Sequence, residues 1–102
     1  MQHLYNITTL VAHPISFEWL NWMRAKHIPE IMKSGCFLEY RLLQLQDQDE
    51  TEGLTFSLQL LAEKREDYER YLRDFAPTLR EEALQNWGEN ALSFRTLMQV
   101  VN

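Results

Sequence analysis

The order in which two kinds of hydrophobic pattern follow one another constrains the fold of this chain most strongly. Four segments alternate apolar with polar residues and are rich in β-branched and aromatic residues, a pattern typical of half-buried strands. Two other segments repeat apolar residues every three or four positions, which indicates helices with one buried face. The predicted strands are residues 5–12, 36–46, 54–61 and 91–101, and the predicted helices are residues 16–27 and 64–86. The predicted order is therefore β-α-β-β-α-β.

This order predicts a ferredoxin-like α+β fold, in which both helices cover one face of a four-stranded antiparallel sheet. The 102 residues contain no linker-like or low-complexity stretch, so residues 1–102 are predicted to form a single domain. Two prolines modify the helices, because proline has no N–H to donate. Pro29 should end or kink the first helix near His27, and Pro77 should bend or restart the second.

Composition excludes several classes of partner. A net charge of −5 at pH 7 disfavours binding to nucleic acid, since the phosphate backbone is also negative. No apolar run approaches the ~18 residues of a membrane-spanning helix, and the first residues lack the pattern of a secretory signal. The single Cys36 fits a reducing compartment, so a cytoplasmic location is expected.

No motif for a metal or a cofactor is found. The three histidines lack the helical spacing of a zinc site. The acidic loop at residues 47–53 resembles a calcium loop only in its first ligands, because Glu52 and Leu58 stand where glycine and glutamate are needed. There is no glycine-rich phosphate loop. We therefore expect neither a metal nor a cofactor.

A sheet covered by helices on one face leaves its other face for solvent or a partner. Strand alternation assigns to that open face a mixture that is too apolar for solvent and too polar for a dry core, which favours a homodimer packed sheet against sheet. The candidate interface residues are Phe37, Glu39, Arg41, Arg95 and Leu97, whereas Leu92, Phe94 and Met98 are assigned to the helix side. The alternative is an open-faced monomer with scattered surface leucines.

His27 is the candidate catalytic residue. It falls on the apolar stripe of the first helix, beside the break that Pro29 introduces. With an ordinary pKa near 6.5, an imidazole there can act as a general acid or base. The alternative is a core histidine whose ring donates to a carbonyl that Pro29 leaves free.

Aromatic residues make a pocket for a planar ligand conceivable near the first helix. The candidate ligand contacts are Trp19, Tyr40, Phe56 and Tyr68, although an ordinary core explains them equally well. Trp22 lies about 140° from the apolar stripe on a 3.6-residue wheel, so it is predicted to point outward, toward the second helix or a partner.

Several short segments together resemble a family of short bacterial proteins described as a domain of unknown function. They are residues 18–23 (EWLNWM), 27–30 (HIPE), 35–37 (GCF), 40–43 (YRLL), 47–50 (DQDE), 68–71 (YERY), 76–80 (APTLR) and 94–97 (FRTL). The family is similar in layout to dimeric α+β barrels, which include cofactor-free oxygenases, isomerases and haem-handling enzymes. The resemblance implies a homodimer with a pocket between the sheet and the helices, near the turn formed by residues 27–29.

Two functions follow from these patterns. The first is a homodimeric small-molecule-binding or cofactor-free catalytic protein, with His27 as proton donor or acceptor and Tyr40 and Tyr68 as orienting hydroxyls. The second is a non-enzymatic homodimeric protein-interaction module, in which an exposed Trp22 or the acidic loop contacts another protein.

Overall fold

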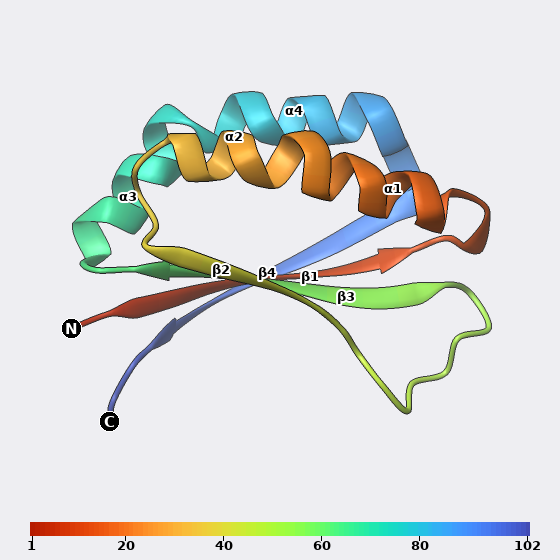
Figure 1. Ribbon diagram of the computed structural model, residues 1–102, viewed down its shortest axis with the longest axis horizontal. Helices are drawn as coiled ribbons and strands as arrows, with labels where there is room; N and C mark the ends of the chain where they lie inside the picture. Colours follow the sequence, from red (N-terminus) through yellow and green to blue (C-terminus); the bar gives the residue numbers. More distant parts are fainter.

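Four antiparallel strands form one sheet in the order β2-β3-β1-β4, and every helix lies on the same face of it, as Figure 1 shows. This computed structural model describes residues 1–102. The strands are β1 (His3–Val11), β2 (Glu39–Gln44), β3 (Leu54–Ala62) and β4 (Ala91–Gln99); the helices are α1 (Ser16–Trp22), α2 (Ile28–Lys33), α3 (Arg65–Asp74) and α4 (Ala76–Trp87). Short turns of helix are η1 (His13–Ile15), η2 (Met23–His27) and η3 (Gly88–Asn90). The predicted ferredoxin-like α+β fold is confirmed.

The first helix was predicted to end or kink near His27, and it does not end there. Instead it widens into the π-helical turn η2 and continues as α2 to Lys33. The N–H of Ile28 donates to the carbonyl of Met23, five residues earlier. Such a turn absorbs the irregularity that Pro29 imposes on the hydrogen bonds of the preceding turn, and the helix axis is kept.

The second helical segment restarts at its proline, as the sequence predicts. Phe75 separates α3 from α4, and Pro77 occupies the first turn of α4, where its missing N–H costs no hydrogen bond. A long amphipathic segment thus becomes two helices with different directions. In Figure 1, α3 lies over the left end of the sheet, and α4 runs back across it toward the first residue of β4.

The densest packing lies under α2 and α3. Ile31, Leu60 and Ala62 have no exposed surface there. Phe37, predicted for the dimer interface, is instead only 6% exposed and packs against Tyr5 and Tyr71, with ring centroids 6.4 and 5.0 Å apart. The prediction was wrong because β2 begins only at Glu39. Phe37 belongs to the connection, which is free to turn its ring toward the helices.

The two faces of β4 are exchanged relative to the prediction. Arg95 and Leu97 lie opposite Ile7 and Tyr5 of β1, and Tyr5 faces the helices. Arg95 and Leu97 therefore belong to the helix side and not to the open face. The prediction assumed that the large apolar residues of this strand point to the core, but the open face holds Leu92, Phe94 and Met98.

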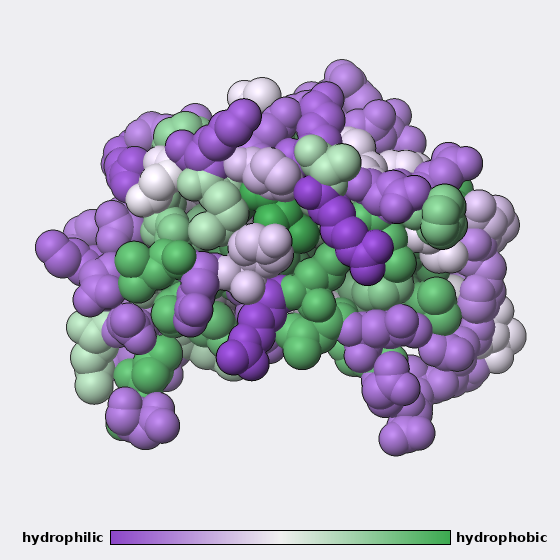
Figure 2. Space-filling view, in the orientation of Figure 1, coloured by the Kyte–Doolittle hydropathy of each residue, from purple (hydrophilic) through white to green (hydrophobic).

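The open face is an apolar surface with few charges. It carries Leu4, Leu10, Leu43, Leu61, Leu92, Phe94 and Met98, with Glu39 and Arg41 on β2 and polar residues along the middle of the two central strands. In Figure 2, polar side chains cover the outer side of the helices, whereas hydrophobic atoms reach the surface between the helices and the sheet. None of the helices has the length and apolarity needed to cross a bilayer.

Candidate functional site

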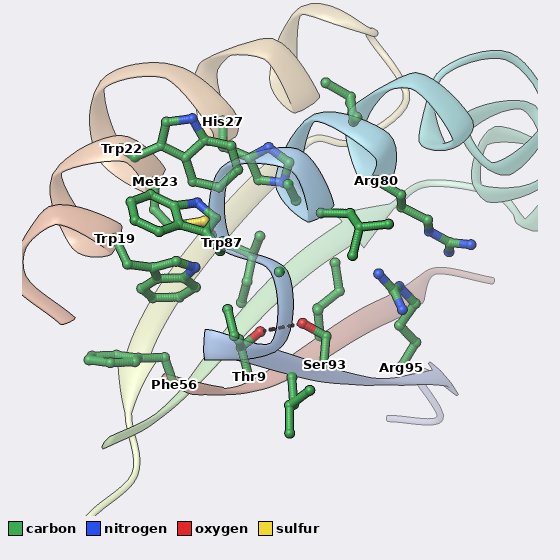
Figure 3. A pocket seen from close by; sticks show the side chains of 18 of the residues that line it. Thr9, Trp19, Trp22, Met23, His27, Phe56, Arg80, Trp87, Ser93 and Arg95 are labelled. Atoms are coloured by element: carbon green, nitrogen blue, oxygen red, sulfur yellow. Dashed lines mark hydrogen bonds between the residues drawn. The ribbon is translucent and has the colours of Figure 1, made fainter. Parts of the chain in front are cut away.

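A cavity of about 440 Å³ lies between the sheet and the helices, on the β1–β4 side of the molecule (Figure 3). Its floor is formed by β1, β3 and β4, and its roof by α1, η2 and α4. Fourteen of its 21 lining residues are hydrophobic. The volume and the lining are those of pockets that hold small organic molecules.

The cavity exists because small residues stand where a core would need large ones. On β4, Ala91 and Ser93 face the helices, and Ala83 faces them from α4. The hydroxyls of Thr9 and Ser93 share a hydrogen bond of 2.9 Å across the β1–β4 pair, which satisfies both groups on the floor. Phe94 and Met98 of this strand point to the opposite face, and Arg95 borders the space at its far end.

All three tryptophans of the chain line the cavity. Trp22 stacks on His27 with centroids 4.4 Å apart and meets Trp87 edge-on at 5.7 Å, while Trp19 packs against Phe56 at 5.2 Å. The outward direction predicted for Trp22 was wrong, because the π-helical turn brings residues five apart onto one side of the helix. Trp22 does contact the second helical segment, one of the two predicted neighbours, through Trp87.

Two of these indoles have unused hydrogen-bond donors. The Nε1 atoms of Trp22 and Trp87 are buried and have no partner within the chain. A buried N–H without an acceptor is costly and rare in folded proteins. Both rings border the cavity, while the Nε1 atoms themselves have almost no exposed surface.

His27 lies in the roof of the cavity and is partly buried. Burial lowers its pKa to about 4, although the nearby carboxylate of Glu82 opposes this shift. The imidazole is therefore neutral at pH 7 and carries one nitrogen that can accept a proton. Its ring forms no hydrogen bond within the chain, so the alternative in which it donates to a free carbonyl is not observed.

Above the cavity, the ammonium of Lys26 and the carboxylate of Glu82 are 2.9 Å apart. This ion pair connects η2 with α4, the two elements of the roof. Because both groups reach solvent, this ion pair holds η2 beside α4 but adds little to the free energy of unfolding.

The opposite end of the cavity is basic. Arg80 of α4 donates from Nη2 to the hydroxyl of Tyr5 at 2.9 Å, and Arg95 of β4 points toward the same place (Figure 3). The hydroxyl of Tyr71 lies nearby; burial raises its pKa, while the charges of both arginines oppose that rise. The phenol therefore stays protonated at neutral pH.

The structure brings only some of the predicted site residues together. Trp19, His27 and Phe56 line the cavity. Tyr40 does not, because it lies on the edge strand β2, about half exposed, over a shallow groove with Leu20. Tyr68 does not either, and packs edge-on against Tyr5 at 5.1 Å.

Several lining residues were missed from the sequence. The sequence patterns predict no role in the site for Trp87 or Arg80. One signal was available in the sequence of β4, where the small residues Ala91 and Ser93 alternate with the large residues Leu92 and Phe94. Small residues on one face of a strand leave space beside Ser93 and beside Thr9, its neighbour on β1. No three His, Cys, Asp or Glu side chains gather in a way that could hold a metal ion.

The order β-α-β-β-α-β, with a four-stranded antiparallel sheet and all helices on one face, defines the ferredoxin-like α+β class. The sequence pattern of the DUF4286 family, a domain of unknown function, matches residues 2–101, and the chain belongs to that family. Among curated proteins, no sequence matches the chain.

Solved structures of the same fold are similar over nearly the whole chain. SnoaB of Streptomyces nogalater, described as a cofactor-independent oxygenase, has a TM-score of 0.66 and 15% identity over 100% of this chain and 96% of its own. An ethyl tert-butyl ether D (EthD) family protein of Bacillus halodurans has a TM-score of 0.70 and 12% identity, covering 96% and 99%. A dimeric ferredoxin-like protein from an uncultured marine organism has a TM-score of 0.64 and 14% identity, covering 99% and 96%. At these identities the likeness establishes the fold.

Proposed function

We propose that this protein is a homodimer that binds a small planar organic molecule in the cavity and uses His27 as a proton acceptor. The observation that carries the proposal is the cavity of about 440 Å³ lined by all three tryptophans, two of which hold unpartnered indole N–H groups. An aromatic wall favours a flat ligand.

The chemistry available to His27 is the removal of a proton from the bound molecule. Its pKa of about 4 keeps the ring neutral, and its stacking on Trp22 fixes the plane of the imidazole. The resulting imidazolium would be stabilised by the carboxylate of Glu82, the charge that already raises the pKa. The proposal needs no metal or cofactor, and SnoaB, a protein of the same fold, is described as a cofactor-independent oxygenase.

The homodimer is proposed from the open face of the sheet. Phe94 is 71% exposed there, beside Leu92 and Met98, and Glu39 and Arg41 supply opposite charges at the β2 edge. A face that is largely apolar, with few charges and with polar residues along its middle, favours a homodimer interface. A protein of the same fold is described as a dimeric ferredoxin-like protein. We also propose a cytoplasmic location, because the single Cys36 is free and buried, which fits a reducing compartment.

The alternative of a protein-interaction module relied on an outward Trp22 or on the acidic loop. Trp22 packs between His27 and Trp87, so its ring is not offered to a partner. Within the loop, the carboxylate of Asp49 accepts from the backbone N–H of Thr51, which is an ordinary turn interaction. No observation favours this alternative.

Thermal unfolding with aromatic probes tests the binding proposal. We expect 2-naphthamide, 2-naphthoate or both to raise the Tm of the wild-type protein and to quench its tryptophan emission. At a hundred times the Kd the gain is about 2.7 kcal/mol. The Ala83→Phe variant fills the cavity and should lose this response. Absence of any shift, or an equal shift in the variant, would contradict the proposal.

Exchange of an acidic C–H with deuterium tests the role of His27. In D₂O, the wild-type protein should accelerate exchange of the α protons of 2-tetralone, followed by NMR. His27→Gln should lose most of this acceleration, since general-base catalysis contributes roughly 10²- to 10⁴-fold. His13→Gln, at an exposed histidine, is the matched control. Equal rates in all three proteins would remove His27 from the chemistry.

Sedimentation tests the homodimer. Phe94→Glu places a charge on the open face and should convert the protein to a monomer with unchanged far-UV circular dichroism. Phe17→Glu is the matched control, because Phe17 is 76% exposed but lies on α1, away from the open face. A monomeric wild-type protein, or a dimeric Phe94→Glu variant, would contradict this assembly.

A further inference from the structure

Two arginines converge at one end of the cavity from different elements. Arg80 comes from α4 and Arg95 from the middle of β4, opposite Ile7 of β1. In Figure 3, both guanidinium groups lie at the end of the cavity away from Trp19 and Trp22. Both arginines line the cavity, and the positive charge of each opposes the rise in the pKa of Tyr71 that burial causes.

Neither arginine has an acidic partner. The four ion pairs of the structure join Lys26 with Glu82, Arg65 with Glu69, Arg70 with Asp67, and Arg73 with Asp74. Glu89 also lines the cavity, but it lies in η3 before the first residue of β4. Ala91 and Arg95 are four residues apart, about 13 Å along a strand, so Glu89 is too distant to neutralise Arg95. A chain with net charge −5 thus keeps two unpaired cations together.

Two phenol hydroxyls add donors to the same end. The oxygen of Tyr5 accepts from Arg80, so its own proton is available to another acceptor. Tyr71 stays protonated because burial raises its pKa. Two guanidinium groups and two hydroxyls therefore face one space, and no acceptor with a full negative charge is supplied by the chain.

We infer that the Arg80–Arg95 end of the cavity binds the carboxylate of an organic acid whose aromatic part occupies the tryptophan end. This inference rests on the proposed function and names its ligand class. The planar fork of arginine matches the two oxygens of a carboxylate, and such charge-assisted hydrogen bonds are about twice as strong as neutral ones. The tryptophan end supplies the apolar contact area that a carboxylate alone would lack.

Calorimetric titration with a matched pair of probes tests the inference. 2-Naphthoate and 2-naphthamide share one ring system and differ in charge. We expect the wild-type protein to bind 2-naphthoate at least ten-fold more tightly. Arg80→Gln and Arg95→Gln should each weaken 2-naphthoate binding about ten- to a hundred-fold, as expected for hydrogen bonds to a charged group, and leave 2-naphthamide binding unchanged.

Arg73→Gln is the matched control, because it removes the same charge from an exposed arginine that pairs only with Asp74. It should bind both probes as the wild type does. Equal wild-type affinity for the two probes, or equal losses in all three variants, would overturn the carboxylate inference while the proposed function stands. Binding of neither probe would overturn both. Retained 2-naphthamide binding shows that an arginine variant is folded.

Discussion

The two ends of the layer between helices and sheet are built in opposite ways. Under α2 and α3, Ile31 and Leu60 are fully buried and Phe37 fills the space beside Tyr71. Under η2 and α4, the sheet presents Ala91 and Ser93, and about 440 Å³ stays open. Tight packing of this kind stabilises a domain. The hollow end holds the polar groups that a core would exclude.

The same contrast separates the charges of the two ends. The hollow end contains a partly buried imidazole, two unpaired guanidinium groups and two unpartnered indole N–H groups. At the closed end, the buried hydroxyl of Ser34 donates to the carbonyl of Ile31 at 2.6 Å. Of the three buried nitrogen atoms without a partner, those of Trp22 and Trp87 lie at the hollow end, and the third is Nδ1 of His3 at the start of β1. Unsatisfied polar groups beside a cavity favour a binding site there.

The largest difference between the two ends should appear on truncation. Ile31→Ala creates a cavity in the closed end and should lower the free energy of unfolding by about 2–5 kcal/mol, measured by urea denaturation. Leu84→Ala, at a half-exposed residue beside the hollow end, should cost well under about 1 kcal/mol. Similar losses in both variants would mean that the hollow end is packed as tightly as the closed one.

Acid should destabilise the hollow end through His27. Its pKa is about 4 in the folded state and near 6.5 when unfolded, so the unfolded chain binds more protons between these values. The free energy of unfolding should therefore fall as pH is lowered from 6.5 to 4, by up to about 3 kcal/mol relative to a His27→Gln variant. His13→Gln, which removes an exposed histidine and leaves His27 in place, is the control. Parallel pH profiles for wild type and His27→Gln would place the imidazole in solvent.

The smallest expected difference in stability between the closed and hollow ends comes from enlarging a side chain at each. Ala62→Phe forces a ring into a site with no exposed surface and should destabilise by about 1–3 kcal/mol. Ala83→Phe places the same ring in the cavity, where space exists, and should change stability by less than about 1 kcal/mol. Thermal unfolding of the two variants gives the comparison. A larger loss for Ala83→Phe would reverse the assignment of the hollow end.

The element order was predictable from the sequence because hydrophobic periodicity reports which backbone geometry buries a face. The π-helical turn was not, because a 3.6-residue wheel assumes one constant angle per residue, and this error displaced Trp22. The sequence predicted that Pro29 disturbs the helix. Whether the helix ends, kinks or forms a π-helical turn depends on whether packing elsewhere holds α2 in line. Ile28 and Ile31 do so here.

The candidate site was predictable only in part, for a reason that β4 makes clear. An alternating strand identifies one face that avoids water, but the pattern does not say what covers that face. In β4 the apolar residues Leu92, Phe94 and Met98 lie on the open face, and the small or polar residues border the cavity. Reading apolar as core therefore inverted the strand. Arg80 and Arg95 meet through tertiary structure alone, since they are 15 positions apart and lie on different elements.

The five residues of η2 set the rotational phase between the two halves of the first helix. Deleting one of them would restore an ordinary α-helix, and each residue turns such a helix by about 100°. In a π-helical turn residues five apart share one side, and in an α-helix residues four apart do, so this deletion would keep Trp19, Trp22 and the buried isoleucines of α2 nearly in phase. The extra residue is thus absorbed within η2, and the wall of the binding space keeps its direction although the helix holds one residue more than an α-helix of the same reach.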